Sequence, residues 1–226
     1  MPIHDLDPLA ASLLSALAIA SLLLSFVLLG SRWLKQYLYA FAAESWVIAA
    51  VSAAVGYLGH YPELYLIAAL TAAFRGVVLP ALIWRMIGRL DIDREFHEIL
   101  QPSSGMVIGA LAVMFALVVS YSIAGALHVE SSVAVLALTV MLAMMLIGFL
   151  LLAIRREAIS QIFGLLVLEN GIFLGSQILV PDMPLLIELV VLFDLLVLIA
   201  CFGVLVAYLQ THAGTTSASG LKRLVG

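Results

Sequence analysis

Residues 131 to 156 read SSVAVLALTVMLAMMLIGFLLLAIRR, and the run from Val133 to Ile154 contains no charged residue. A bilayer core about 30 Å thick is crossed by about 20 apolar residues in helical conformation, so this run is long enough to span it. Arg155 and Arg156 follow directly, at the point where a span returns to a polar interface. The stretch therefore predicts a transmembrane helix.

The whole chain has a similar character. Its 226 residues are 65% hydrophobic and 11% charged, with a mean hydropathy of +1.21, whereas a soluble domain is about 25% charged. The net charge is −4 with ten Lys and Arg residues, which excludes the basic surface that nucleic acid binding requires. Cys201 is the one cysteine, so an intrachain disulfide or a four-thiolate cluster is also excluded.

Apolar runs separated by turn signals predict an all-α integral membrane protein with about seven transmembrane helices. We expect them at residues 8–30, 36–58, 63–88, 105–127, 131–154, 158–180 and 184–210. Residues 1–104 then form a three-helix segment with a charged cytoplasmic loop, residues 105–210 a four-helix segment, and residues 211–226 a cytoplasmic tail. We expect no signal peptide, because no Lys or Arg precedes the first apolar run.

The basic residues predict the orientation of these helices, because short loops rich in Lys and Arg stay in the cytoplasm. Nine of the ten fall in alternate turns and in the tail: Arg32, Lys35, Arg85, Arg89, Arg94, Arg155, Arg156, Lys222 and Arg223. With an odd number of spans, this places the N-terminus outside and the C-terminus in the cytoplasm. We expect a multi-pass protein of the inner (plasma) membrane.

Five ionisable residues lie inside the apolar runs: Glu44, Arg75, Glu169, Glu188 and Asp194. Each costs about 2.5 to 3.5 kcal/mol at the centre of a membrane helix, so we expect them to face protein or water. Helical rise places three of them near the midplane, with Glu44 nearer the cytoplasmic face and Glu188 nearer the outer face. We interpret the five as proton-relay candidates; the alternative is that Arg75 pairs with one carboxylate only to fix helix packing.

Other residues have simpler interpretations. Three glycines at small-residue spacing predict close approach of helices: Gly164, Gly171 and Gly175. Three methionines are interpreted as packing residues: Met141, Met144 and Met145. The chain has no phosphate-binding loop, nucleophile elbow or metal-ligand spacing, so we expect no catalytic, cofactor-binding or metal-binding residues.

Residues 155–171, RREAISQIFGLLVLENG, resemble component E of hydrogenase-4 and of related formate hydrogenlyase-type complexes. The resemblance covers most of the chain and extends to residues 74–80, FRGVVLP, where relatives usually have Lys at the position of Arg75, and to parts of the tail. An Arg there keeps its charge permanently, so Arg75 is interpreted as an electrostatic modulator and a poor proton carrier.

The last three predicted helices are also similar to the K subunit of respiratory complex I and the C subunit of multi-subunit cation/proton antiporters. Both have a double-Arg turn followed by a Gly and then an Asn, here Gly164 and Asn170. The K subunit places a Glu where this chain has Leu166, and Glu169 lies three residues further on, near the same helix face. The second Glu of that subunit corresponds to Asp194 or to Glu188.

The resemblance implies a non-catalytic membrane subunit of an energy-converting group 4 nickel-iron hydrogenase, a formate hydrogenlyase-type complex or a complex I-related complex. Its partners would be antiporter-like membrane subunits and a hydrophilic arm that carries nickel-iron and iron-sulfur centres. The chain itself would hold no redox centre and would contribute buried carboxylates to proton translocation or its coupling to electron transfer. Two alternatives remain open: a subunit of a multi-subunit sodium/proton antiporter, and a structural membrane scaffold.

Overall fold

The computed structural model describes residues 7–81, 84–85, 102–129, 131–155 and 158–181, together with Leu196 and Gly203. The helices are α1 (Pro8–Gly30), α2 (Leu34–Gly59), α3 (Glu63–Leu70), η2 (Thr71–Val78), α5 (Pro102–Leu127), α6 (Ser132–Ile154) and α7 (Ala158–Leu179). The predicted all-α fold is confirmed for these residues.

Six helical stretches in the described part of the chain are long and apolar enough to cross a membrane, and α3 and η2 together form one of them, Glu63–Ala81. Their bounds agree with the first six predicted spans to within about three residues, except that the third stretch is described as far as Ala81 and the predicted span continues to residue 88, partly outside the described residues. The seventh predicted span, residues 184–210, lies outside the described residues except for Leu196 and Gly203, which are helical. The chain divides into two compact units, Met1–Glu188 and Leu189–Gly226, and the helices named above belong to the first.

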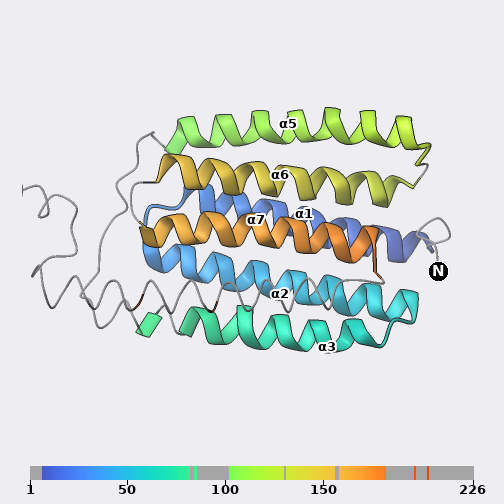
Figure 1. Ribbon diagram of the computed structural model, residues 1–226, viewed down its shortest axis with the longest axis horizontal. Helices are drawn as coiled ribbons and strands as arrows, with labels where there is room; N and C mark the ends of the chain where they lie inside the picture. The colour runs from blue at the N-terminus through green and yellow to red at the C-terminus, as the bar shows by residue number, and fades with distance from the viewer. Residues whose placement is uncertain are drawn as a thin grey trace, which may run out of the picture. The chain divides into compact units, whose positions relative to one another are not determined.

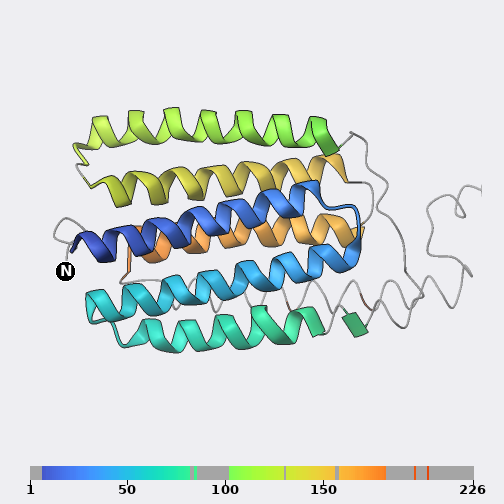
Figure 2. The same ribbon diagram turned by 180° about the vertical axis from the view of Figure 1, so that it is seen from behind.

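The helices of the first unit lie side by side along their length (Figure 1). α5 lies at one edge and α3 at the other, and α1 and α7 lie between them on opposite faces, α7 in front in Figure 1 and α1 in front in Figure 2. α6 packs against α1, α5 and α7, while α2 packs against α1, α3, η2 and α7. Helices from both sides of residue 104 thus form one bundle, centred on α1, α2, α6 and α7.

Glycines allow α6 and α7 to approach closely. A Cβ on Gly148 of α6 would lie 2.7 Å from the carbonyl oxygen of Gly164 and 2.7 Å from the amide nitrogen of Leu168 on α7. A Cβ on Gly171 would lie 2.8 Å from Cβ of Met144, which is fully buried. These backbone contacts leave no room for a side chain, so the predicted packing role of the α7 glycines is confirmed.

The surface of the bundle is apolar where neighbouring helices do not cover it. Large side chains of α5 such as Val107, Leu111 and Phe115 are exposed by 61%, 63% and 62%. Such a surface suits contact with lipid tails, which are as apolar as the side chains themselves.

Two of the helices end at a histidine with positive φ. His60 follows α2 with φ of 58°, and His128 follows α5 with φ of 54°. This left-handed conformation is a common way to end a helix.

We expect Gly148→Ala to destabilise the bundle, because the new methyl group meets backbone atoms that cannot move independently of α7. The expected loss is about 1 to 3 kcal/mol of unfolding free energy, as for other overpacked sites. Gly125→Ala in α5 is the matched control, since a Cβ there meets nothing within 4 Å. Equilibrium unfolding in mixed micelles measures both; equal stability of the two variants would contradict the close packing of α6 on α7.

Candidate functional site

Arg75 lies in η2, a π-helical segment that continues α3. Its side chain is 1% exposed, although it stands in the middle of an apolar stretch. The segment lies close to α2, because a Cβ on Gly76 would be only 3.0 Å from Nε1 of Trp46. Short π-helical segments inside longer helices are frequent at functional sites. No sequence pattern predicted this π-helical segment.

Arg75 is paired with Glu169 of α7. Its Nη2 donates to Oε2 of Glu169 at 3.0 Å, and the Glu169 side chain is 13% exposed. The guanidinium carbon lies 5.9 Å from the ring centroid of Phe173, one turn after Glu169 on the same helix. The pair thus joins η2 to α7 across the interior of the bundle, with an aromatic ring beside the cation.

Glu44 of α2 differs from Glu169 in that its hydrogen-bond partners are neutral groups. Ser25 Oγ of α1 donates to its Oε1 at 2.6 Å, and Asn170 Nδ2 of α7 donates to its Oε2 at 2.9 Å. All three side chains are fully buried. A carboxyl group inside an apolar bundle is retained only when hydrogen bonds compensate for the lost water, and here two other helices provide them.

These contacts form two hydrogen-bonded groups that meet at adjacent residues of α7. We call them together the polar row: Ser25, Glu44, Asn170, Glu169 and Arg75. Asn170 directly follows Glu169 in α7, so a single turn of this helix contacts both the carboxyl group of α2 and the guanidinium of η2. The row brings together α1, α2, α7 and η2. It contains two carboxyl groups, one paired with a permanent cation and one bonded to a hydroxyl and an amide.

The predicted relay residues have three different outcomes. Arg75 and Glu169 pair, as one of the two interpretations required. Glu44 bonds Asn170, the residue that follows Glu169 in α7, so the structure brings it near the pair; its predicted depth nearer the cytoplasmic face stays a prediction. Glu188 and Asp194 lie outside the described residues.

Sequence reasoning missed the neutral members of the polar row. Ser25 stood in an apolar run as one of several serines, and Asn170 was noted only as part of a family pattern. Their signal is weak because serines in membrane helices usually bond their own backbone: Ser45 and Ser52 donate to the carbonyl oxygens four residues earlier. Ser25 and Asn170 become partners of Glu44 only because α1 and α7 pack on α2.

Arg155 is a second buried cation that the sequence did not predict, since it was counted as a loop residue. It is 1% exposed, and its Nη2 donates to the carbonyl oxygen of Ser31 at 2.9 Å and approaches that of Leu29 at 3.5 Å. The last carbonyls of a helix have no partner within the helix and carry partial negative charge. Arg155 therefore stabilises the end of α1 from the end of α6, and its guanidinium carbon lies 5.1 Å from the ring centroid of Tyr37.

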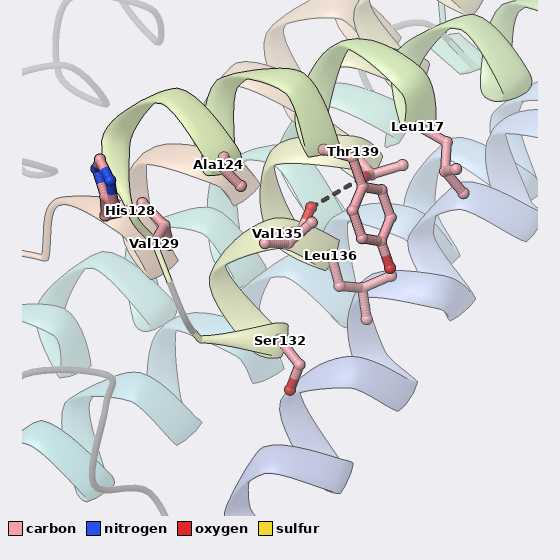
Figure 3. A pocket seen from close by; sticks show the side chains of 10 residues that line it. Leu117, Ala124, His128, Val129, Ser132, Val135, Leu136 and Thr139 are labelled. Atoms are coloured by element: carbon pink, nitrogen blue, oxygen red, sulfur yellow. Dashed lines mark hydrogen bonds between the residues drawn. The ribbon is translucent and has the colours of Figure 1, made fainter.

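A cavity of about 560 Å³ lies between α5 and α6, away from the polar row. Figure 3 shows its lining, with Ser132 and His128 at the end where the two helices connect and Leu117 farther along α5. The Thr139 hydroxyl donates to the carbonyl oxygen of Val135 at 2.8 Å. None of the ten lining residues carries a carboxylate or a permanent positive charge, so we place the candidate site at the polar row.

Comparison with known proteins identified a distant relative. An uncharacterized protein of Mycobacterium tuberculosis, Rv0085, is 27% identical over 215 residues, which cover 94% of this chain and 96% of the relative. No family model matches the chain, and no solved structure matches it. The similarity therefore extends over nearly the whole of both chains and carries no activity with it.

We expect Arg75→Gln to destabilise the protein strongly, because Glu169 would keep a buried charge without its partner. Removing one member of a buried ion pair costs about 3 to 5 kcal/mol. The double variant Arg75→Gln/Glu169→Gln leaves two neutral amides and should lose much less. A double-mutant cycle from equilibrium unfolding in mixed micelles measures the coupling; additive losses would show that the two side chains do not interact.

Arg155→Lys should also destabilise the bundle, since a single ammonium group cannot reproduce the planar guanidinium that reaches the end of α1 and lies beside Tyr37. We expect a loss of about 1 to 3 kcal/mol, the cost of leaving buried acceptors unsatisfied. Arg32→Lys is the control, because Arg32 is exposed at the same end of the bundle. Thermal unfolding in detergent compares the two variants, and an unchanged Arg155→Lys protein would refute the capping role.

Proposed function

We propose that this chain is a non-catalytic, multi-pass membrane subunit of an energy-converting complex related to group 4 nickel-iron hydrogenases and complex I. In this proposal its buried carboxyl groups contribute to proton translocation or to the coupling of translocation with electron transfer. The observation that carries the proposal is the polar row, in which two carboxyl groups and one cation from three helical spans lie together in an apolar bundle. Chains of carboxyl groups and polar side chains are a common way to relay protons inside membranes.

The two carboxyl groups of the row support this function because their surroundings differ. Glu169 faces a guanidinium that stays charged, whereas Glu44 faces only a hydroxyl and an amide at hydrogen-bond distance among the described residues. Neighbouring carboxyl groups with unequal environments are suited to unequal roles in proton transfer. A group with fixed charge can modulate a neighbouring group that exchanges a proton.

A scaffold function also has a specific observation in its favour. The Arg75–Glu169 pair, 3.0 Å long, is a buried link between η2 and α7, which a structural role accounts for without proton exchange. This interpretation does not account for Glu44, which binds no cation among the described residues and could be replaced by an apolar side chain if packing were its only role. We therefore favour the relay proposal for the row as a whole and a structural role for this pair within it.

The proposal includes the topology and the partners implied by the resemblance of residues 155–171. The chain has seven spans, with its N-terminus outside and its C-terminus in the cytoplasm, in the inner membrane. Antiporter-like subunits lie beside it in the membrane, and a hydrophilic arm carries the nickel-iron and iron-sulfur centres. The composition supports such an arrangement, because a chain that is 65% hydrophobic has little mass for a soluble redox domain.

The experiment that tests this proposal is gentle purification of the chain with a C-terminal tag, followed by identification of its companions. We expect a large nickel-iron subunit together with antiporter-like membrane subunits. The same purification with Arg75→Gln should recover less of the assembly, because the unpaired charge disturbs the bundle. Antiporter subunits alone would favour the sodium/proton antiporter alternative, and recovery of the chain without companions would contradict the proposal.

A further inference from the structure

The hydroxyl of Ser25 lies between two acceptors. Its Oγ is 2.6 Å from Oε1 of Glu44 and 3.1 Å from the carbonyl oxygen of Ser21, one turn earlier in α1. A hydroxyl has one hydrogen to donate and two lone pairs to accept with. Ser25 therefore donates to only one of these oxygens at a time. Its contact with the other oxygen is not a hydrogen bond donated by Ser25.

Two hydrogen-bond arrangements satisfy these distances. When Glu44 is ionised, Ser25 donates to Oε1, and Asn170 donates to Oε2. When Glu44 carries a proton on Oε1, that proton is donated to Ser25 Oγ, and the Ser25 hydrogen turns to the carbonyl oxygen of Ser21. The second arrangement keeps every heavy atom in place, because 2.6 Å is typical of a short O–H···O bond and 3.1 Å is that of a long, weak one.

We propose that Glu44 is the proton-binding site of the polar row, and that rotation of the Ser25 hydroxyl allows the site to hold Glu44 in both its charged and its neutral form. This inference rests on the proposed function and identifies its exchanging group. Binding forms an O–H bond at Oε1 and removes one negative charge; release reverses both changes. Ser25 acts as a positioning residue, because its hydroxyl turns between acceptors while the proton travels on Glu44.

Glu169 cannot play the same part without a large cost. Its protonation would break the buried ion pair with Arg75, whose side chain is 1% exposed. The charged groups of the described helices near Glu44 are thus Arg75 on η2 and Glu169 on α7. α1 carries no ionisable side chain from Pro8 to Gly30, and neither does α6 from Ser132 to Ile154. Glu44 is therefore the carboxyl group of the row that can change its charge while the ion pair stays intact.

Infrared difference spectroscopy tests this inference on the full chain in sealed native membrane vesicles. The carbonyl stretch of a protonated carboxyl group is assigned to Glu44 by its loss in Glu44→Gln. We expect the band to appear on acidification and to move in frequency in Ser25→Ala, which removes the acceptor of the Glu44 proton. Proton translocation by the same Ser25→Ala vesicles should fall roughly tenfold, the effect of losing one hydrogen bond to a charged group.

Two further variants separate this role from simple packing. Ser25→Thr keeps the hydroxyl and should restore both the band and the translocation rate. Ser52→Ala is the matched control, because Ser52 is a buried serine of α2 whose hydroxyl donates to the carbonyl oxygen of Ile48 at 3.1 Å. It should leave both measurements as in the wild type. Equal effects of Ser25→Ala and Ser52→Ala would overturn the inference.

The two proposals fail in different ways. A Glu44 band that is absent at every pH at which the vesicles translocate protons, or that Ser25→Ala leaves unmoved, overturns the role of Glu44 and Ser25 while the proposed function stands. Vesicles in which the wild-type assembly moves no protons overturn the proposed function. In that case the infrared measurement still decides the proton-binding role of Glu44 by itself.

Discussion

The cost of an unpaired charge in an apolar interior is the constraint on which this bundle depends. Arg75 is never neutral under physiological conditions, so the helix that carries it must lie where a carboxylate can reach it. Glu169 provides that carboxylate, and the ion pair links η2 to α7, while both elements pack on α2. The position of α7 then places Asn170 against Glu44, and α1 completes the environment of Glu44 through Ser25. The ion pair and the environment of the second buried carboxyl group thus meet at adjacent residues of α7.

Close helix packing makes these contacts possible. Hydrogen bonds of 2.6 to 3.0 Å between side chains on different helices require those helices to approach within a narrow range of distances. Gly148 and Gly164 bring the backbones of α6 and α7 together, and Arg155 ties the end of α6 to the end of α1. The polar row therefore lies in a bundle whose geometry is fixed both by small residues along the helices and by a cation at their ends.

The helices were predictable from the sequence, because an apolar run of about 20 residues bounded by charges or turn residues has few alternatives to a membrane helix. The ionisable residues were also identifiable, since each stands out in such a run. Their partners were not: Ser25 and Asn170 are selected by the packing of three helices, and hydropathy contains no information on that packing. Arg155 was missed for a related reason, because a basic residue after a span usually faces water, whereas here α1 ends beside it.

The contrast between Glu44 and Glu169 links this structure to its proposed function. In the proposed function, the Arg75–Glu169 pair keeps its charges, and the neighbouring carboxyl group, whose hydrogen-bond partners are neutral, exchanges a proton. In this proposal, assembly and proton movement depend on different members of the polar row. The two carboxyl groups are nevertheless close along α7, because Glu44 is bonded to Asn170 and Glu169 directly precedes Asn170. A purely structural role does not explain why one carboxyl group has a cationic hydrogen-bond partner and the other has neutral ones.

The most direct measurement is proton translocation by sealed vesicles that contain Glu44→Gln in an otherwise wild-type chain, with assembly confirmed by recovery of the companion subunits. Gln keeps the approximate volume of Glu44 and can still bond Ser25 and Asn170, but it cannot bind and release a proton. The account predicts normal assembly with translocation abolished. Unchanged translocation in a correctly assembled complex would contradict it and would leave Glu44 with a structural role.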